Sequence, residues 1–161
     1  MKKKMNNKGF SLVELIVVIA IMAVLIGVLA PTLLGNIEKS RLAKDKDAID
    51  ILYKAWQTTA SNPDYTVKDG TYVYSVSGGQ IAVNSASNTA DIKLEKDGTA
   101  GWTAFEKELE EYIGDANIKL SSKYYTASDA DAKVTIIVTT GGKVALNVDA
   151  KDSKGDYKVN E

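Results

Sequence analysis

The feature that most constrains this chain of 161 residues is one long apolar run near its N-terminus. From residue 15 to residue 34, 17 of 20 residues are apolar, and no charged residue follows until Glu38. At about 1.5 Å per residue, a helix of this length spans about 30 Å, the hydrocarbon thickness of a bilayer. A buried core helix rarely stays uncharged for so long, and the run exceeds the usual apolar region of a secretory signal peptide, about 7–15 residues. The run therefore predicts a membrane-spanning helix.

The charges that flank the run predict its orientation. Four lysines precede it at positions 2, 3, 4 and 8, with no acidic residue among them, whereas the segment after it mixes both signs. Positively charged flanks stay on the cytoplasmic side of a membrane. We therefore expect the N-terminus in the cytoplasm, a single pass through the plasma membrane, and the rest of the chain outside.

The composition excludes many kinds of active site. The chain has no Cys and no His, which excludes disulfides, Cys/His zinc sites, Cys–His nucleophiles and Ser-His-Asp triads. Its formal charge of −1 argues against a nucleic-acid partner. We expect a protein that is not an enzyme and that needs no cofactor.

A short motif stands immediately before the apolar run. Gly9 is followed by the aromatic Phe10, and Glu14 comes four residues later, one turn along a helix face. A lone carboxylate at the edge of a membrane helix is costly unless it is paired or lies near the interface. Together with the basic residues 1–9, the apolar run and Pro31, this pattern resembles the class III signal of type IV pilins. The resemblance covers about the first third of the chain.

The resemblance implies a role for each residue of the motif. A prepilin peptidase would cut between Gly9 and Phe10, so that residues 1–9 are a cleaved leader, and the new amine of Phe10 would be N-methylated. In an assembled filament, Glu14 of one subunit would neutralise the Phe10 amine of its neighbour, because either charge left unpaired in an apolar bundle is strongly unfavourable. A tolerated interfacial glutamate is the alternative interpretation of Glu14.

The apolar run contains a proline that predicts a bend. Pro31 lacks a backbone donor and crowds the preceding turn, and Gly27 lies four residues earlier. We expect a helix kink at this pair, and the resemblance implies a segment that curves in the monomer. A proline that a membrane helix simply tolerates is the alternative.

The second half of the predicted helix is amphipathic. We expect one helix over residues 10–60, with residues 10–34 for membrane insertion and polymerisation and residues 35–60 as its amphipathic half. Its apolar stripe consists of Leu42, Ile49, Leu52 and Trp56. The sequence Ser61-Asn62-Pro63 predicts its end. Four apolar positions over two heptads are too few to favour a coiled coil, so the rest of the chain must cover the stripe.

Residues 61–161 predict a globular head, which makes the fold α+β. Strands are expected at residues 71–76, 80–84 and 91–95. A capping box from Thr103 to Glu106 predicts the start of a short helix over 103–113, and Gly114 predicts its end. Many pilins close this part of the head with a disulfide, and this chain departs from that pattern because it has no Cys.

An antiparallel hairpin is predicted at residues 133–149. Val134, Ile136 and Val138 alternate on one arm, and Val144, Leu146 and Val148 alternate on the other. A two-residue Gly141-Gly142 turn would place the two apolar sets on opposite faces. We therefore expect a three-residue loop that pairs Val138 with Val144, with Gly142 in the left-handed conformation and the apolar face packed on the helical stripe.

Acidic residues near the C-terminus are the candidates for a metal site. Asp149, Asp152 and Asp156 lie close in sequence, as do Asp129 and Asp131. Neither group fits the pattern of a calcium-binding loop, so a solvated turn is the favoured interpretation and we expect no metal.

These patterns together predict a major-pilin-like structural subunit of a type IV pilus. The family implies polymerisation with other copies of the chain, a prepilin peptidase, an assembly ATPase, a membrane platform protein, and extracellular filaments for adhesion, biofilm formation or twitching motility. A pseudopilin of a type II secretion or DNA-uptake system is the alternative, and a calcium-dependent C-terminal loop would favour it. A membrane-tethered enzyme or receptor domain is a third hypothesis, which the missing Cys and His disfavour.

Overall fold

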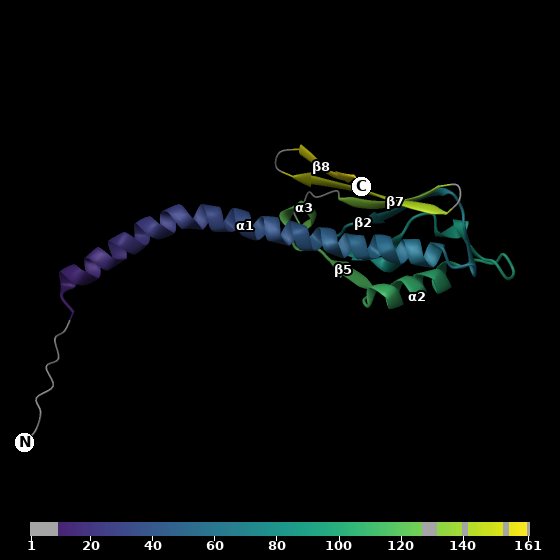
Figure 1. Cartoon of the computed structure of the whole chain (residues 1–161), viewed down its shortest axis with the longest axis horizontal. Helices are drawn as coiled ribbons and strands as arrows, with labels where there is room; N and C mark the ends of the chain where they lie inside the picture. The colour runs from purple at the N-terminus through teal and green to yellow at the C-terminus, as the bar shows by residue number, and fades with distance from the viewer. Residues whose placement is uncertain (1–9, 127–131, 140–141, 153–154, 161) are drawn as a thin grey trace, which may run out of the picture. The chain divides into compact units, whose positions relative to one another are not determined.

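The computed structural model describes residues 10–126, 132–139, 142–152 and 155–160, and for Ala90 and residues 151–160 it describes the backbone alone. The chain divides into two compact units, residues 1–37 and residues 38–161. Helix α1 (Leu12–Ala60) begins in the first unit and ends in the second (Figure 1). The α+β class is confirmed, and the predicted helix over residues 10–60 is correct to within two residues. The finer division at residue 34 stays a prediction.

A four-stranded antiparallel sheet lies in the second unit (Figure 1). Its strand order is β2-β6-β7-β8, built from Gly70–Ser75, Lys133–Thr139, Lys143–Asp152 and Gly155–Asn160. The predicted hairpin is confirmed, because Val138 lies opposite Val144 and Ile136 opposite Leu146. Gly142 has a φ of 74°, the left-handed conformation expected of it. Alternation of apolar residues therefore set the register of β6 against β7.

The second unit also has two smaller antiparallel sheets of two strands each. One pairs β1 (Tyr65–Val67) with β4 (Ile92–Leu94), and the other pairs β3 (Gln80–Ala82) with β5 (Asn117–Lys119). The strand predicted at 71–76 corresponds to β2, shifted by one residue. The strand predicted at 80–84 was too long, because the 3₁₀ helix η1 (Val83–Ser85) begins where β3 ends.

Helix α2 (Trp102–Ile113) begins one residue earlier than predicted, and the capping box is wrong. Gly101 occupies the N-cap position without any side-chain cap, so Thr103 lies inside the first turn. The N–H of Gly101 donates to the carbonyl of Ile92 at 2.9 Å, so contact with β4 fixes the start of the helix. A Cβ on Gly101 would lie 2.8 Å from the carbonyl carbon of Lys93, which explains the glycine. Gly114 ends α2 at a φ of 82°, as predicted.

Trp56 is the centre of the core in the second unit. Its side chain is fully buried, and its Nε1–H donates to the Tyr74 hydroxyl on β2 at 2.8 Å. The indole lies 4.8 Å from the Tyr72 ring and 4.9 Å from the Phe105 ring of α2, measured between centroids. One side chain of α1 thus contacts both the sheet and α2. The predicted packing of the helical stripe on the sheet is confirmed, with Ile49, Leu52 and Trp56 buried and Leu42 partly buried.

The same face of α1 also carries a buried carboxylate that the sequence did not suggest. Asp45 is 1% exposed. Its Oδ1 accepts the N–H of Ser121 at 2.8 Å, and its Oδ2 accepts the N–H of Ser122 at 2.7 Å. Two turns before Asp45, Glu38 accepts the N–H of Lys123 at 2.5 Å. The short helix α3 (Lys123–Thr126) begins at this residue. These two carboxylates therefore attach the chain that enters α3 to α1.

Candidate functional site

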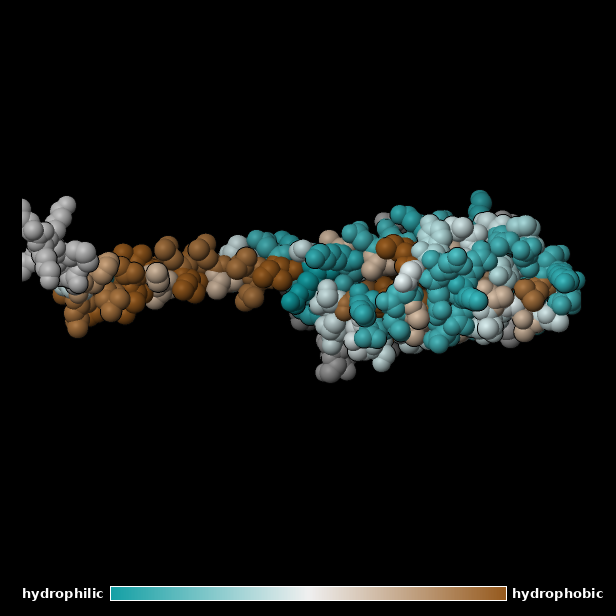
Figure 2. Space-filling view, turned by 90° about the horizontal axis from the view of Figure 1, so that it is seen from below, coloured by the Kyte–Doolittle hydropathy of each residue, from teal (hydrophilic) through white to brown (hydrophobic). Residues whose placement is uncertain are grey.

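The first unit presents its apolar side chains to the surroundings. The large hydrophobic side chains from Leu12 to Ile37 are at least 40% exposed, and Figure 2 shows them as a hydrophobic surface along the helix. This part of α1 is long and apolar enough to cross a membrane, and none of its most apolar stretch is buried inside the chain. Such a surface needs lipid or other apolar helices around it. The segment is a membrane-anchoring helix, and which end faces the cytoplasm stays a prediction.

An N-terminal cap that was not among the sequence predictions begins α1. The N–H of Ser11 donates to the Glu14 Oε2 at 2.8 Å, and the N–H of Val13 reaches the Ser11 Oγ at 3.4 Å. The Glu14 bond is that of a Ser-x-x-Glu capping box, and the Ser11 hydroxyl caps the N–H two residues on in place of the usual one three residues on. The signal was present in the sequence as Ser11 three residues before Glu14. The cap satisfies backbone donors that have no partner within the helix.

The cap also determines where the Glu14 charge lies. The carboxylate is held at the N-terminal end of α1, where the helix dipole favours a negative charge. Phe10 precedes the helix and is 92% exposed, so its aromatic ring packs against none of the residues that the structure describes. Gly9, the other residue of the predicted cleavage site, lies outside the described residues. A negative charge and an exposed aromatic residue therefore lie four residues apart at one end of the apolar helix.

Gly27 and Pro31, the residues of the predicted kink, lie inside α1, which continues through both. Because Pro31 has no N–H, the carbonyl of Gly27, four residues earlier, loses its donor within the helix. A Cβ on Gly27 would meet nothing within 4 Å, so packing inside the chain does not require a glycine there. The pair leaves the helix one hydrogen bond short at this turn, and the kink itself stays a prediction.

The candidates for a metal site are spread along the last two strands. Asp149 of β7 lies opposite Lys158 of β8, and Asp156 lies opposite Lys151. Asp152 lies opposite Gly155. Asp129 and Asp131 are outside the described residues. Within the described part of the chain, no three acidic side chains gather in a way that could hold a metal ion.

Comparison with known proteins identifies the N-terminal segment. Residues 4–30 match the family described as the prokaryotic N-terminal methylation motif, the class III signal of type IV pilins. The matched range includes Gly9, Phe10, Ser11 and Glu14 and most of the apolar run. No curated protein and no solved structure matches the chain. The resemblance seen in the sequence is therefore confirmed for the signal and the apolar helix.

Proposed function

We propose that this chain, which begins with a class III signal of type IV pilins, is the structural subunit of a type IV pilus. The observation that carries the proposal is the methylation motif at residues 4–30, in register with a helix whose apolar surface is exposed around its whole circumference. A passive anchor needs the apolar helix alone. A polymerising subunit also needs a cleavage site and a carboxylate at its start, and both are present in the sequence.

In the proposed precursor, the lysines of residues 1–9 hold the N-terminus in the cytoplasm, and the second unit lies outside the membrane. Cleavage after Gly9 removes four of the 20 basic side chains and leaves all 21 acidic ones, so the side-chain charge changes from −1 to −5. The new amine, methylated on Phe10, lies next to the Glu14 carboxylate of a neighbouring copy in the filament. A helix that docked at the wrong height would bury an unpaired charge, so the pair selects one register.

The experiment that tests this function compares wild-type cells with cells that carry Gly9→Leu. We expect surface filaments that contain the chain in the wild type, collected by shearing and seen by immuno-electron microscopy. We expect the variant to stay in the membrane fraction at its precursor mass, because the peptidase needs close approach to the backbone at Gly9. Wild-type cells that export no filaments containing the chain would contradict the proposal.

A pseudopilin would carry the same N-terminal motif, so the motif does not separate the two systems. They differ in where the assembled chain is found. A pilus subunit is recovered in the sheared extracellular fraction, whereas a pseudopilin stays in the cell envelope as a short assembly. An envelope-restricted, cleaved chain whose deletion stops protein secretion or DNA uptake would establish the pseudopilin function instead.

A further inference from the structure

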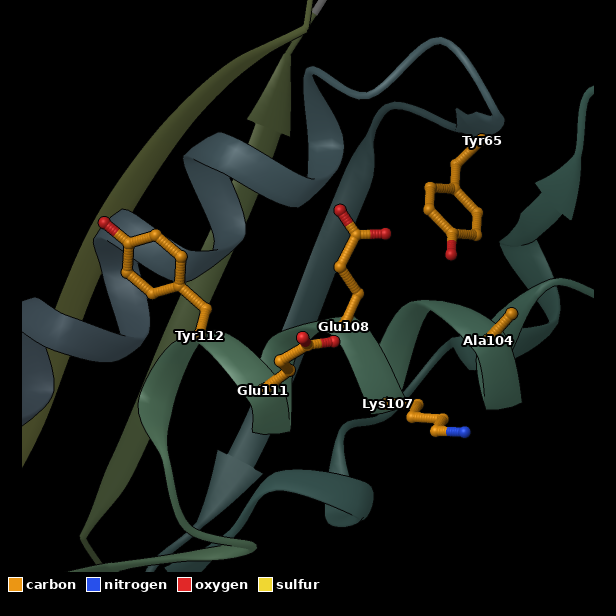
Figure 3. A pocket seen from close by; sticks show the side chains of 6 residues that line it. All are labelled: Tyr65, Ala104, Lys107, Glu108, Glu111 and Tyr112. Atoms are coloured by element: carbon orange, nitrogen blue, oxygen red, sulfur yellow. The ribbon is translucent and has the colours of Figure 1, made fainter.

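A groove lies along the outer face of α2 in the second unit. It has a volume of about 540 Å³ and is lined by Tyr65 of β1 together with Ala104, Lys107, Glu108, Glu111 and Tyr112 of α2. The α2 residues recur at helical spacings of three and four, so they share one face of the helix. Figure 3 shows the Tyr65 hydroxyl directed toward α2 and the small side chain of Ala104 at the same end of the groove.

Contacts within the second unit fix two side chains of the groove, Glu108 and Tyr65. The amide nitrogen of Asn62 donates to the two carboxylate oxygens of Glu108 at 3.1 and 3.2 Å. The Tyr65 ring packs edge-on against Phe105, with centroids 5.3 Å apart. Burial, together with the Glu108 carboxylate, raises the pKa of Tyr65, so its hydroxyl stays protonated and able to donate. Glu111 is exposed, and no ion pair to it is found in the part of the chain that the structure describes. With Lys107 one turn earlier, the groove carries two carboxylates and one ammonium, a net charge of −1.

A second surface of the same unit carries the opposite charge. Arg41 and Lys44 are exposed on α1, three residues apart and therefore neighbours on the helix. Two of the acidic residues beside them are already engaged, because Asp45 is buried against the backbone of residues 121 and 122 and Glu38 accepts the N–H of Lys123. The third, Asp47, is exposed three residues after Lys44. This basic ridge, Arg41 and Lys44, therefore presents cations that the unit itself neutralises only in part, through the 3.7 Å pair of Arg41 with Glu38.

Each of the two surfaces also adjoins an exposed apolar side chain. Among the described residues of the second unit, the large hydrophobic side chains left exposed are Ile51, at 43%, and Tyr112, at 51%. Ile51 lies seven residues after Lys44, on the same side of α1, and Tyr112 follows Glu111 in the groove. Tyrosine and arginine are enriched where protein surfaces dock, because they combine a large apolar body with a polar end.

We propose that the α2 groove of one copy receives the basic ridge of a second copy of this chain. The aliphatic stem of Lys44 would pack on the tyrosine rings, and its ammonium would lie between Glu108 and Glu111. The occupant is a second copy because the complementary charges and the two exposed apolar side chains are all on this chain. The inference rests on the proposed function, which brings many copies together, and it names the contact that their second units make.

The absence of cysteine makes a direct test possible. We would co-express two full-length chains, one with Lys44→Cys and the other with Glu111→Cys, and oxidise the sheared filaments. A disulfide between the two chains is necessarily a contact between copies, since each chain has one thiol. We expect a dimer on a non-reducing gel, with residues 44 and 111 joined in its cross-linked peptide. A second pair, Lys44→Cys with Ala104→Cys, keeps both glutamates and covers the case in which loss of Glu111 weakens assembly.

The matched control replaces Lys44→Cys with Lys143→Cys, another exposed lysine, at the start of β7. The inference predicts severalfold more dimer from the Lys44 pairs than from the Lys143 pair. Equal amounts of dimer from both, in cells that make normal filaments, would overturn it and leave the proposed function intact. Cells that make no filaments would contradict the proposed function itself, so the two failures are distinguishable.

Discussion

The buried carboxylate of Asp45 accepts the backbone N–H of Ser122 at 2.7 Å, across 77 positions of the chain. A carboxylate can be buried at modest cost only if strong donors replace its water, and the N–H groups of residues 121 and 122 supply them. This contact attaches the segment before β6 to α1 without a disulfide. It therefore contributes to the cohesion of a second unit that has no cysteine.

Replacement of Asp45 by Ala should destabilise the second unit by about 2–3 kcal/mol, because the buried N–H of Ser122 and the partly buried N–H of Ser121 lose a charged acceptor. Asp45→Asn keeps one carbonyl acceptor and should cost less. Thermal unfolding of the full chain in detergent, followed by the near-UV signal of its aromatic residues, measures both. An Ala variant that melts within 1 °C of the wild type would show that the contact contributes nothing to stability.

Stability should fall at high pH because of buried tyrosines. Burial, with a smaller contribution from Asp91 and Asp69, raises the pKa of Tyr72 to about 12 from 10.0. Between these values the unfolded chain releases a proton that the folded chain keeps, so the free energy of unfolding decreases as pH rises above 10 and is unaffected below it. The melting temperature of Tyr72→Phe should depend less on pH in this range. If the melting temperature of the variant and that of the wild type fell equally with pH, Tyr72 would not be the group responsible.

Gly78 and Gly79 form a matched pair of substitutions. Both have positive φ values, 57° and 72°, but a Cβ on Gly79 would lie 2.7 Å from a methyl of Thr126 and 2.8 Å from the carbonyl oxygen of Leu120. A Cβ on Gly78 would meet nothing within 4 Å. We expect Gly78→Ala to cost about 1 kcal/mol and Gly79→Ala about 2–4 kcal/mol, measured by the same unfolding experiment. Equal losses in the free energy of unfolding for the two variants would show that the chain at Gly79 moves to relieve the contact with Thr126 and Leu120 at no cost.

Glu14→Ala should leave the chain cleaved and inserted in the membrane but should sharply reduce the amount of sheared filaments. Glu14 has two functions in this account, as the cap of Ser11 and as a charge partner in the filament. Glu14→Gln separates them, because an amide oxygen can still accept the Ser11 N–H but carries no charge. We expect the Gln variant to assemble as poorly as the Ala variant. Normal filaments from either variant would exclude the charge pair.

The parts of the fold that depend on periodicity were predictable. Alternating valines gave the β6–β7 register, and the change from an all-apolar to an amphipathic helix gave the stripe around Trp56. Three-residue strands such as β1 and β5 were missed, because so few residues show no period. Strand β8 was also missed, because its alternation rests on two apolar residues alone, Tyr157 and Val159.

The site was predictable where a local pattern encodes it, and otherwise it was not. The methylation motif was identified from Gly9, Phe10 and Glu14 and is confirmed by the family match. Asp45 was assigned to the charged segment after the run, although it lies three residues after Leu42 and four before Ile49, on the buried face. Its partners are 76 and 77 residues away, so no local pattern could identify them. The α2 groove depends on Tyr65 and α2 coming together, which is equally non-local.

The mass of the N-terminal peptide shows whether this chain is processed into a filament subunit. Filaments sheared from cells would be digested, and the N-terminal peptide of the subunit would be measured by mass spectrometry. We expect a peptide that begins at Phe10 and carries one methyl group on its amine. A chain that retains Met1 and residues 2–9, found only in the membrane fraction, would contradict it.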